Sequence, residues 1–256
     1  MPRNSHPGTP DLTNKPNPNL PIMKKTALIL AALFTGAALS ADEAPAAPAS
    51  SYSITADIPY VSTYVFRGLK AAGGSLQPSL KLTSGGAYGG IWFSQPLNSD
   101  YGNEIDFYGG YTFALTKSWS LDVGATYYYY PELDTSGGAH SGTFEGYAGL
   151  TGTITGALTG SVYVYRDFTL DATTVQGGLG YAVPLNDKLT MNFAATLGTV
   201  SPDEGDDYTY YGASVTFPWK ISDQATITSG FNYATNDLDG AEDNLFWVNL
   251  GFTYSF

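Results

Sequence analysis

Side chains suited to catalysis are scarce in this sequence. Its 256 residues include no cysteine and two histidines, which leaves no thiolate nucleophile and disfavours zinc or copper sites built from Cys and His. His140 precedes Ser141 in a glycine-rich segment, and a histidine beside a serine is the minimum pair for hydrolysis. Adjacent residues in such a loop have no fixed geometry. We therefore expect no enzyme activity, no catalytic residue, no metal and no cofactor.

Charged residues that alternate with apolar ones are more informative. In the segment 103–113, Glu104 and Asp106 fall on one face of an extended chain, whereas Phe107 and Phe113 fall on the other. The same period places further charged residues on polar faces that we expect to point inward: Asp57, Arg67, Lys81, Glu104, Asp106, Asp122, Glu145 and Lys188. The segment 158–169 has two competing faces, one of valines and one of tyrosines.

These inward charges have two alternative roles. Charged rings in a barrel bore set its ion preference, so an excess of acids predicts a pore lining that mildly prefers cations. In the other role the groups pair across the interior and fill it. Arg67 matters most in this choice, because a guanidinium can bind several carboxylates. We expect Glu104 and Asp106 to be its partners.

The elements that position these residues are β-strands. The last segment, 244–256, alternates strictly, with Phe246, Val248, Leu250, Phe252, Tyr254 and Phe256 on one face. Charged residues make up 13% of the chain, whereas soluble domains carry about 25%. A transmembrane β-barrel explains the deficit, because lipid-facing residues cannot be charged. The terminal Phe256 also resembles the signal by which barrel-assembly machinery recognises outer-membrane barrels.

Period-two segments recur from residue 53 onward with turn residues between them. We predict strands at 53–69, 75–83, 87–95, 103–114, 119–130, 143–155, 158–169, 173–183, 188–199, 208–218, 223–234 and 244–256. Short connections alternate with long ones, as periplasmic turns alternate with external loops. The fold class predicted is therefore all-β, a closed antiparallel transmembrane barrel of about twelve strands with both termini in the periplasm. A soluble β-sandwich is the alternative.

The N-terminal residues divide into three expected segments. From Met23 the chain has two lysines, an apolar run and small residues, which is the organisation of a secretory signal peptide over 23–41, with cleavage after Ser40 or Ala41. Residues 1–22 are then an upstream extension that is not translated natively. The Ala/Pro segment 42–52 is expected to be a disordered linker. The barrel occupies 53–256.

The charge balance limits the partners. The formal net charge is −12, and nucleic acid is excluded because such a surface repels phosphates. Two long connections, near 200–207 and 235–243, are rich in Asp and Glu, either as solvated loops or as a place where divalent cations bridge to lipopolysaccharide. Outer-membrane lipid, lipopolysaccharide and small solutes are the expected partners.

A short motif resembles a known family. The segment Ser62-Thr-Tyr-Val-Phe-Arg-Gly68 is similar to the Tyr-x-Phe-Arg-Gly signature that opens the TorF-type porins of Gram-negative bacteria. The Gly- and Tyr-rich strands and the final Phe extend the resemblance over residues 53–256. It implies an outer-membrane barrel described as a pore, without an established solute and without catalytic residues.

The expected function is passive diffusion of small hydrophilic solutes or ions through a narrow, mildly cation-preferring lumen in the cell outer membrane. Arg67, Lys81, Glu104, Asp106, Asp122, Glu145 and Lys188 would line this pore. The alternative is a non-conducting structural or adhesive barrel that displays the acidic external loops.

Overall fold

The computed structural model describes residues 52–98, 101–133, 135 and 140–256. The expected extension and signal peptide, and all of the linker except Tyr52, lie outside them. The strands are β1 (Ser53–Val61), β2 (Tyr64–Phe66), β3 (Leu69–Ala72), β4 (Ser75–Leu76), β5 (Ser79–Ser84), β6 (Ala87–Pro96), β7 (Glu104–Ala114), β8 (Trp119–Tyr129), β9 (Gly142–Thr155), β10 (Leu158–Asp167), β11 (Ala172–Pro184), β12 (Thr190–Pro202), β13 (Tyr208–Lys220), β14 (Ala225–Asn236) and β15 (Leu245–Ser255). In the described part of the chain, no helix is long and apolar enough to cross a membrane.

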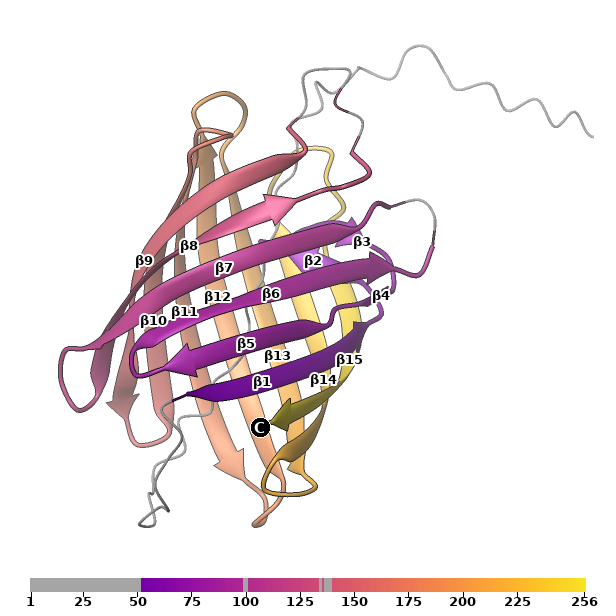
Figure 1. Cartoon of the computed structure of the whole chain (residues 1–256). Coiled ribbons are helices and arrows are strands. Elements are labelled where there is room, and N and C mark those ends of the chain that lie inside the picture. Colours follow the sequence, from indigo (N-terminus) through magenta and orange to yellow (C-terminus); the bar gives the residue numbers. More distant parts are fainter. Residues whose placement is uncertain (1–51, 99–100, 134, 136–139) are drawn as a thin grey trace, which may run out of the picture.

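The strands form a closed antiparallel barrel (Figure 1). Sequence neighbours pair with each other from β5 to β15, and β1 closes the cylinder against β15, with Ile58 opposite Phe252. Between β1 and β6, β4 and β5 form one barrel strand. It is interrupted at Gln77 and Pro78, where proline has no N–H to donate to the ladder. The barrel therefore has twelve strands, which confirms the predicted fold class.

Side chains alternate between the outer surface and the interior. On β7, Phe107 is 50% exposed, whereas Glu104 and Asp106 are 5% and 2% exposed, as predicted. The two faces of β10 are now distinguished, because Val162 is 56% exposed while the tyrosine next to it, Tyr163, points inward. An apolar outer surface on a sheet without free edges satisfies the two requirements of a structure surrounded by lipid.

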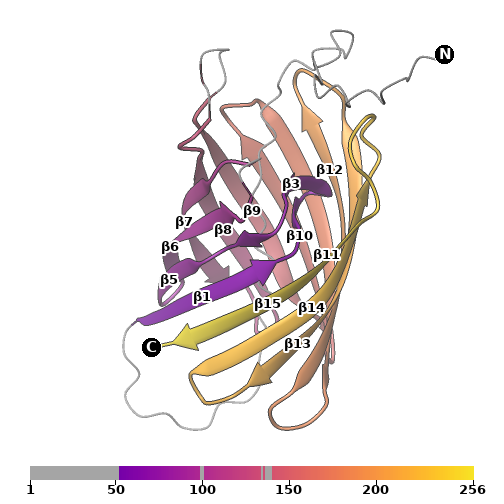
Figure 2. The same cartoon turned by 90° about the vertical axis from the view of Figure 1, so that its right-hand side faces the viewer.

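The two ends of the barrel differ in their connections. The turn end has the short connections 85–86, 115–118, 156–157, 185–189 and 221–224. The loop end has the connections 97–103, 130–141, 168–171, 203–207 and 237–244. The start of β1 and the end of β15 lie side by side at the turn end (Figure 2), where the Phe256 N–H donates to the Ile54 carbonyl at 2.9 Å.

The first predicted strand, 53–69, is wrong in its second half. β1 ends at Val61, and β2 and β3 form a separate two-stranded hairpin before the chain rejoins the barrel at β4. A wall strand would expose alternate side chains to lipid, but Tyr64, Val65 and Phe66 are all buried. Arg67 and Gly68 then take φ of 45° and 78°, which is the two-residue turn of a hairpin. The other predicted strands agree to within three residues at each end.

Candidate functional site: the lumen at the loop end

The β2–β3 hairpin lies across the inside of the barrel at its loop end. The Tyr64 hydroxyl donates to Glu104, the first residue of β7, at 3.0 Å. The Gly68 carbonyl accepts from the amide of Asn236, the last residue of β14, at 2.9 Å. The side chain at the hairpin tip, Arg67, binds β9. Because β7, β9 and β14 are separate parts of the wall, the hairpin must cross the lumen to contact all three.

Both faces of the hairpin pack against the wall. Tyr64 packs against Trp92 of β6, with ring centroids 5.5 Å apart. Val65 points the opposite way and packs with Ala234 of β14 and Leu245 of β15. Alternate residues of a strand face opposite sides, so opposite faces of the hairpin contact different walls. The hairpin therefore fills much of the lumen at this level.

An ion pair fixes the hairpin tip. The Arg67 guanidinium donates from Nη1 to Glu145 Oε2 at 2.9 Å and from Nη2 to Oε1 at 3.0 Å, and the two side chains are 9% and 2% exposed. The guanidinium carbon lies 4.5 Å from the ring centroid of Phe66 and 4.8 Å from that of Tyr165. The Tyr128 hydroxyl also donates to Oε1 at 2.9 Å. Bidentate, charge-assisted pairs of this kind are among the stronger hydrogen-bonded contacts.

The prediction that Glu104 and Asp106 bind Arg67 is wrong. Arg67 lies on a turn inside the lumen instead of on a wall strand, and from there it reaches β9. Glu104 accepts hydrogen bonds from Tyr64 and Tyr130, each at 3.0 Å. Asp106 is 2% exposed and its Oδ1 has no hydrogen-bond partner. A buried carboxylate is unfavourable without a donor or a cation.

A second polar cluster lies on the inner faces of β5 to β10. Asp122 of β8 accepts from the hydroxyls of Tyr88 at 2.9 Å and Tyr163 at 3.2 Å. The Tyr88 and Tyr147 hydroxyls are 2.6 Å apart, and Lys81 Nζ lies 5.0 Å from the Tyr88 ring centroid. These tyrosines narrow the lumen along this part of the wall.

The opposite wall is lined differently. On β11 to β15, most positions between lipid-facing residues carry small or amide side chains, including Gln176, Gly178, Gly180, Ala194, Thr196, Ser214, Thr216, Asn232 and Asn249. The Asn232 amide donates to Asn249 Oδ1 at 2.9 Å. Two aromatic side chains are exceptions, namely Tyr210, whose hydroxyl donates to Gln176, and Trp247, which packs against the hairpin. The acids thus lie along one side of the lumen and mostly small uncharged side chains along the other.

The remaining predicted residues lie apart from the hairpin. Asp57 accepts from the Thr253 hydroxyl at 2.6 Å across the β1–β15 seam. Lys188 is exposed in the turn before β12 instead of lying on that strand, so its predicted strand position is wrong. The turn is closed locally by Asn186, whose side chain accepts from the Lys188 N–H at 2.9 Å. His140 is exposed in the loop between β8 and β9.

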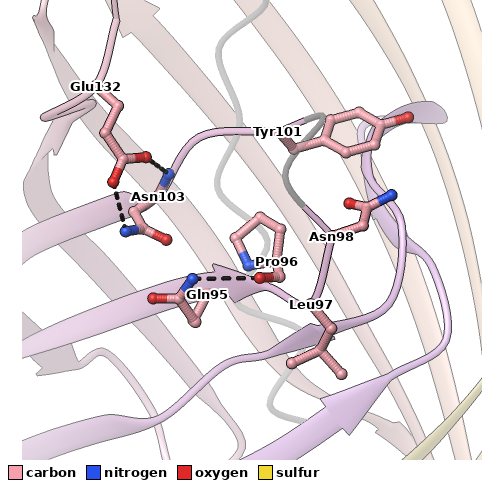
Figure 3. A pocket seen from close by; sticks show the side chains of 7 residues that line it. All are labelled: Gln95, Pro96, Leu97, Asn98, Tyr101, Asn103 and Glu132. Atoms are coloured by element: carbon pink, nitrogen blue, oxygen red, sulfur yellow. Dashed lines mark hydrogen bonds between the residues drawn. The ribbon is translucent and has the colours of Figure 1, made fainter.

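A pocket at the rim of the loop end is shown in Figure 3. Glu132 accepts from the Asn103 backbone N–H at 2.7 Å and from its side-chain amide at 2.8 Å. The Gln95 amide donates to the Pro96 carbonyl at 3.2 Å. The bonds from Asn103 to Glu132 join two loops at the rim, whereas the bond from Gln95 to Pro96 is local to the end of β6.

The sequence did not predict the tyrosines whose hydroxyls donate to Glu104 and Asp122, namely Tyr64, Tyr88, Tyr130 and Tyr163. It also missed the hairpin. A partial signal was present, because the run Tyr64 to Phe66 has no polar position on either face and is followed by Arg-Gly. Such a run indicates burial on both sides followed by a turn, and the lipid-facing wall of a barrel offers only one buried side.

The fold is similar to solved outer-membrane channels. The KdgM porin aligns with a TM-score of 0.55 at 11% identity, covering 79% of this chain and 99% of that one. The NanC porin aligns at 0.53 and 12% identity, covering 78% and 98%. An outer membrane channel from Pseudomonas putida F1 aligns at 0.52 and 12% identity, covering 84% and 100%. At these identities the likeness establishes the fold alone.

No curated protein matches the sequence. The profile of the Gcw_chp family, whose description is "Bacterial protein of unknown function", matches residues 45–254, which include every strand of the barrel except the last residue of β15. The chain therefore belongs to the Gcw_chp family of bacterial proteins.

Proposed function

We propose that this protein is an outer-membrane porin-like channel for the passive diffusion of small hydrophilic solutes or ions, with its turn end in the periplasm. The observation that carries the proposal is a closed twelve-stranded barrel with an apolar exterior and a polar interior. The KdgM, NanC and Pseudomonas putida channels share this architecture. The Tyr-x-Phe-Arg-Gly segment supports the same function through its resemblance to the TorF-type porins.

The proposed lumen is narrow and mildly prefers cations. Eight strands leave an interior filled by side chains and sixteen or more leave a wide channel, so twelve strands lie between these limits. Glu145 is neutralised by Arg67, whereas Glu104, Asp106 and Asp122 accept only from neutral groups or have an unpartnered oxygen. KdgM has been solved with oligogalacturonate, a polyanion. The acids in this lumen favour cations or neutral solutes over such a ligand.

A non-conducting scaffold is the second candidate, and the hairpin favours it. Tyr64, Val65 and Phe66 are 4%, 9% and 3% exposed, whereas side chains that line an open aqueous path would be hydrated. In this role the barrel supports the acidic loops 203–207 and 237–244 at the cell surface, as a structural or adhesive protein.

Planar-bilayer recording separates the two candidates. The refolded wild-type protein is compared with a variant in which residues 62–74 are replaced by Asn-Gly. Val61 and Ser75 are paired directly, so a two-residue turn joins them without breaking the barrel ladder. Discrete conductance steps in either protein support the channel. Silence of both folded proteins across salts and voltages supports the scaffold.

A further inference from the structure

We propose that the β2–β3 hairpin is a displaceable gate, that Arg67 holds it closed by occupying a guanidinium-binding site on the barrel wall, and that its displacement uncovers a carboxylate cluster that binds permeating cations. The cluster consists of Glu104 and Asp106 of β7 and Glu145 of β9, on one side of the lumen. This inference rests on the proposed channel function and adds to it a closing mechanism and a ligand class.

The hairpin can leave without opening the barrel wall. β2 and β3 form their own two-stranded sheet, separate from the barrel sheet. Directly beneath them the wall is already continuous, because Val61 pairs with Ser75. Among the described residues, each hydrogen bond or ion pair that joins β2, β3 or their turn to the wall and loops involves at least one side chain, as in the bonds from Arg67 to Glu145 and from Asn236 to the Gly68 carbonyl. Displacement therefore costs docking contacts and no barrel ladder bond.

The wall site is suited to a planar guanidinium. Glu145 offers two carboxylate oxygens to the two Nη atoms of Arg67, and the Tyr165 ring lies 4.8 Å from the guanidinium carbon. Tyr128 orients Glu145 through its hydroxyl. A bidentate acceptor beside an aromatic ring recognises a guanidinium better than an ammonium, which is a compact point charge.

The backbone at Arg67 indicates that its side chain is required. Its φ is 45°, in the left-handed region that is unfavourable for residues with a Cβ. Two-residue hairpin turns with both φ values positive prefer Asn-Gly or Asp-Gly. Arginine is thus a poor choice for the turn, and strain of this kind in an otherwise well-packed element points to a function for the side chain.

In the closed state the hairpin binds two of the three acids of the carboxylate cluster. Arg67 binds Glu145, and Tyr64 binds Glu104. Asp106, 2% exposed, keeps one oxygen without a partner. When the hairpin moves away, Glu104 and Glu145 lose their hairpin partners beside Asp106, near the mouth of the barrel. Carboxylates that line a bore attract cations.

The first test removes the guanidinium without damaging the turn. Arg67→Asn supplies the preferred Asn-Gly turn, so a loss of closure cannot be ascribed to a hairpin that fails to form. We expect the fraction of time that the channel conducts to rise about tenfold or more, which corresponds to 1.4 kcal/mol or more. Arg67→Lys keeps the charge but lacks the planar guanidinium. Its conducting fraction should lie between those of the wild type and Arg67→Asn. Lys70→Gln removes a more exposed ion pair from the same hairpin, with side chains 30% and 59% exposed, and should change little.

The second test fills the vacated site. Methylguanidinium added on the loop side should reduce the current of the Arg67→Asn channel at lower concentration than methylammonium, and Glu145→Gln should abolish the difference. Equal potency of the two cations would overturn the guanidinium site. If the variant lacking residues 62–74 conducts while Arg67→Asn conducts as the wild type does, the proposal that Arg67 holds a gate closed is wrong, whereas the proposed channel function is still supported. If the hairpin-free barrel folds and never conducts, the channel itself is wrong.

Discussion

The Arg67–Glu145 pair gives the most quantitative prediction. Its side chains are 9% and 2% exposed, so it belongs with buried ion pairs, for which removing one partner costs about 3–5 kcal/mol. Exposed pairs are worth roughly 0.2–1 kcal/mol. The hairpin can move into water once the pair is broken, which limits the loss. We therefore expect a coupling energy of about 2–3 kcal/mol between the two residues, below the full penalty for an unpaired buried charge.

A double-mutant cycle measures this coupling. Arg67→Asn, Glu145→Gln and the double variant are refolded into lipid vesicles, and the free energy of unfolding is measured in urea. Tryptophan fluorescence reports hairpin docking, because the Trp92 ring centroid lies 5.5 Å from that of Tyr64 and Trp247 also packs against the hairpin. Each single variant should shift the tryptophan emission, and the double variant should be less destabilised than the sum of the singles. A coupling energy below about 1 kcal/mol, within the range of exposed pairs, would refute the assignment of this pair as the closing contact.

Three further predictions concern facing, packing and charge. Leu197 is 53% exposed on the outer surface, so Leu197→Arg should destabilise the barrel by about 2–4 kcal/mol if the position lies near the bilayer midplane. Thr196→Arg, on the inner face, should cost much less. Equal urea midpoints of the two variants would contradict the assignment of Leu197 to the outer face and Thr196 to the inner face. Gly68→Ala should loosen the hairpin, since its Cβ would lie 2.5 Å from a wall Cβ at a φ of +78°, and an unchanged Trp fluorescence would contradict this. The hydrogen bond from Arg166 lowers the pKa of Asp203, so this contact stabilises the loop above the ordinary carboxyl pKa and is lost as the pH falls through the lowered value. Arg166→Gln should return that pKa towards its ordinary range in an NMR titration, and an unchanged titration midpoint would show that the hydrogen bond is not its cause.

The wall of the barrel could be predicted from sequence because its environment imposes a simple rule. Lipid outside and polar groups inside force a period of two, which residues such as Phe107 and Asp106 follow on β7. Strand ends were also readable, because Gly and Asn residues mark the turns. The shift of Lys188 from strand to turn is the ordinary uncertainty of such boundaries.

The interior could not be predicted in the same way. Whether an inward acid binds an arginine or a tyrosine depends on the strand register and on which segment enters the lumen. The period of two predicts neither the register nor that segment. The period of two predicts a wall position for Arg67, because its segment continues the alternation of β1 for several residues. The alternation alone does not distinguish the Val162 face of β10 from the Tyr163 face, whereas the hydrogen bond from Tyr163 to Asp122 places Tyr163 inside.

The most direct test of the account is the reversal potential of the hairpin-free barrel in a salt gradient. With residues 62–74 replaced by Asn-Gly, the folded barrel should conduct and prefer cations, and adding Glu104→Lys with Asp106→Lys should shift the reversal potential towards anions. A folded barrel that does not conduct, or a reversal potential that the two lysines leave unchanged, would contradict a water-filled path lined by these acids.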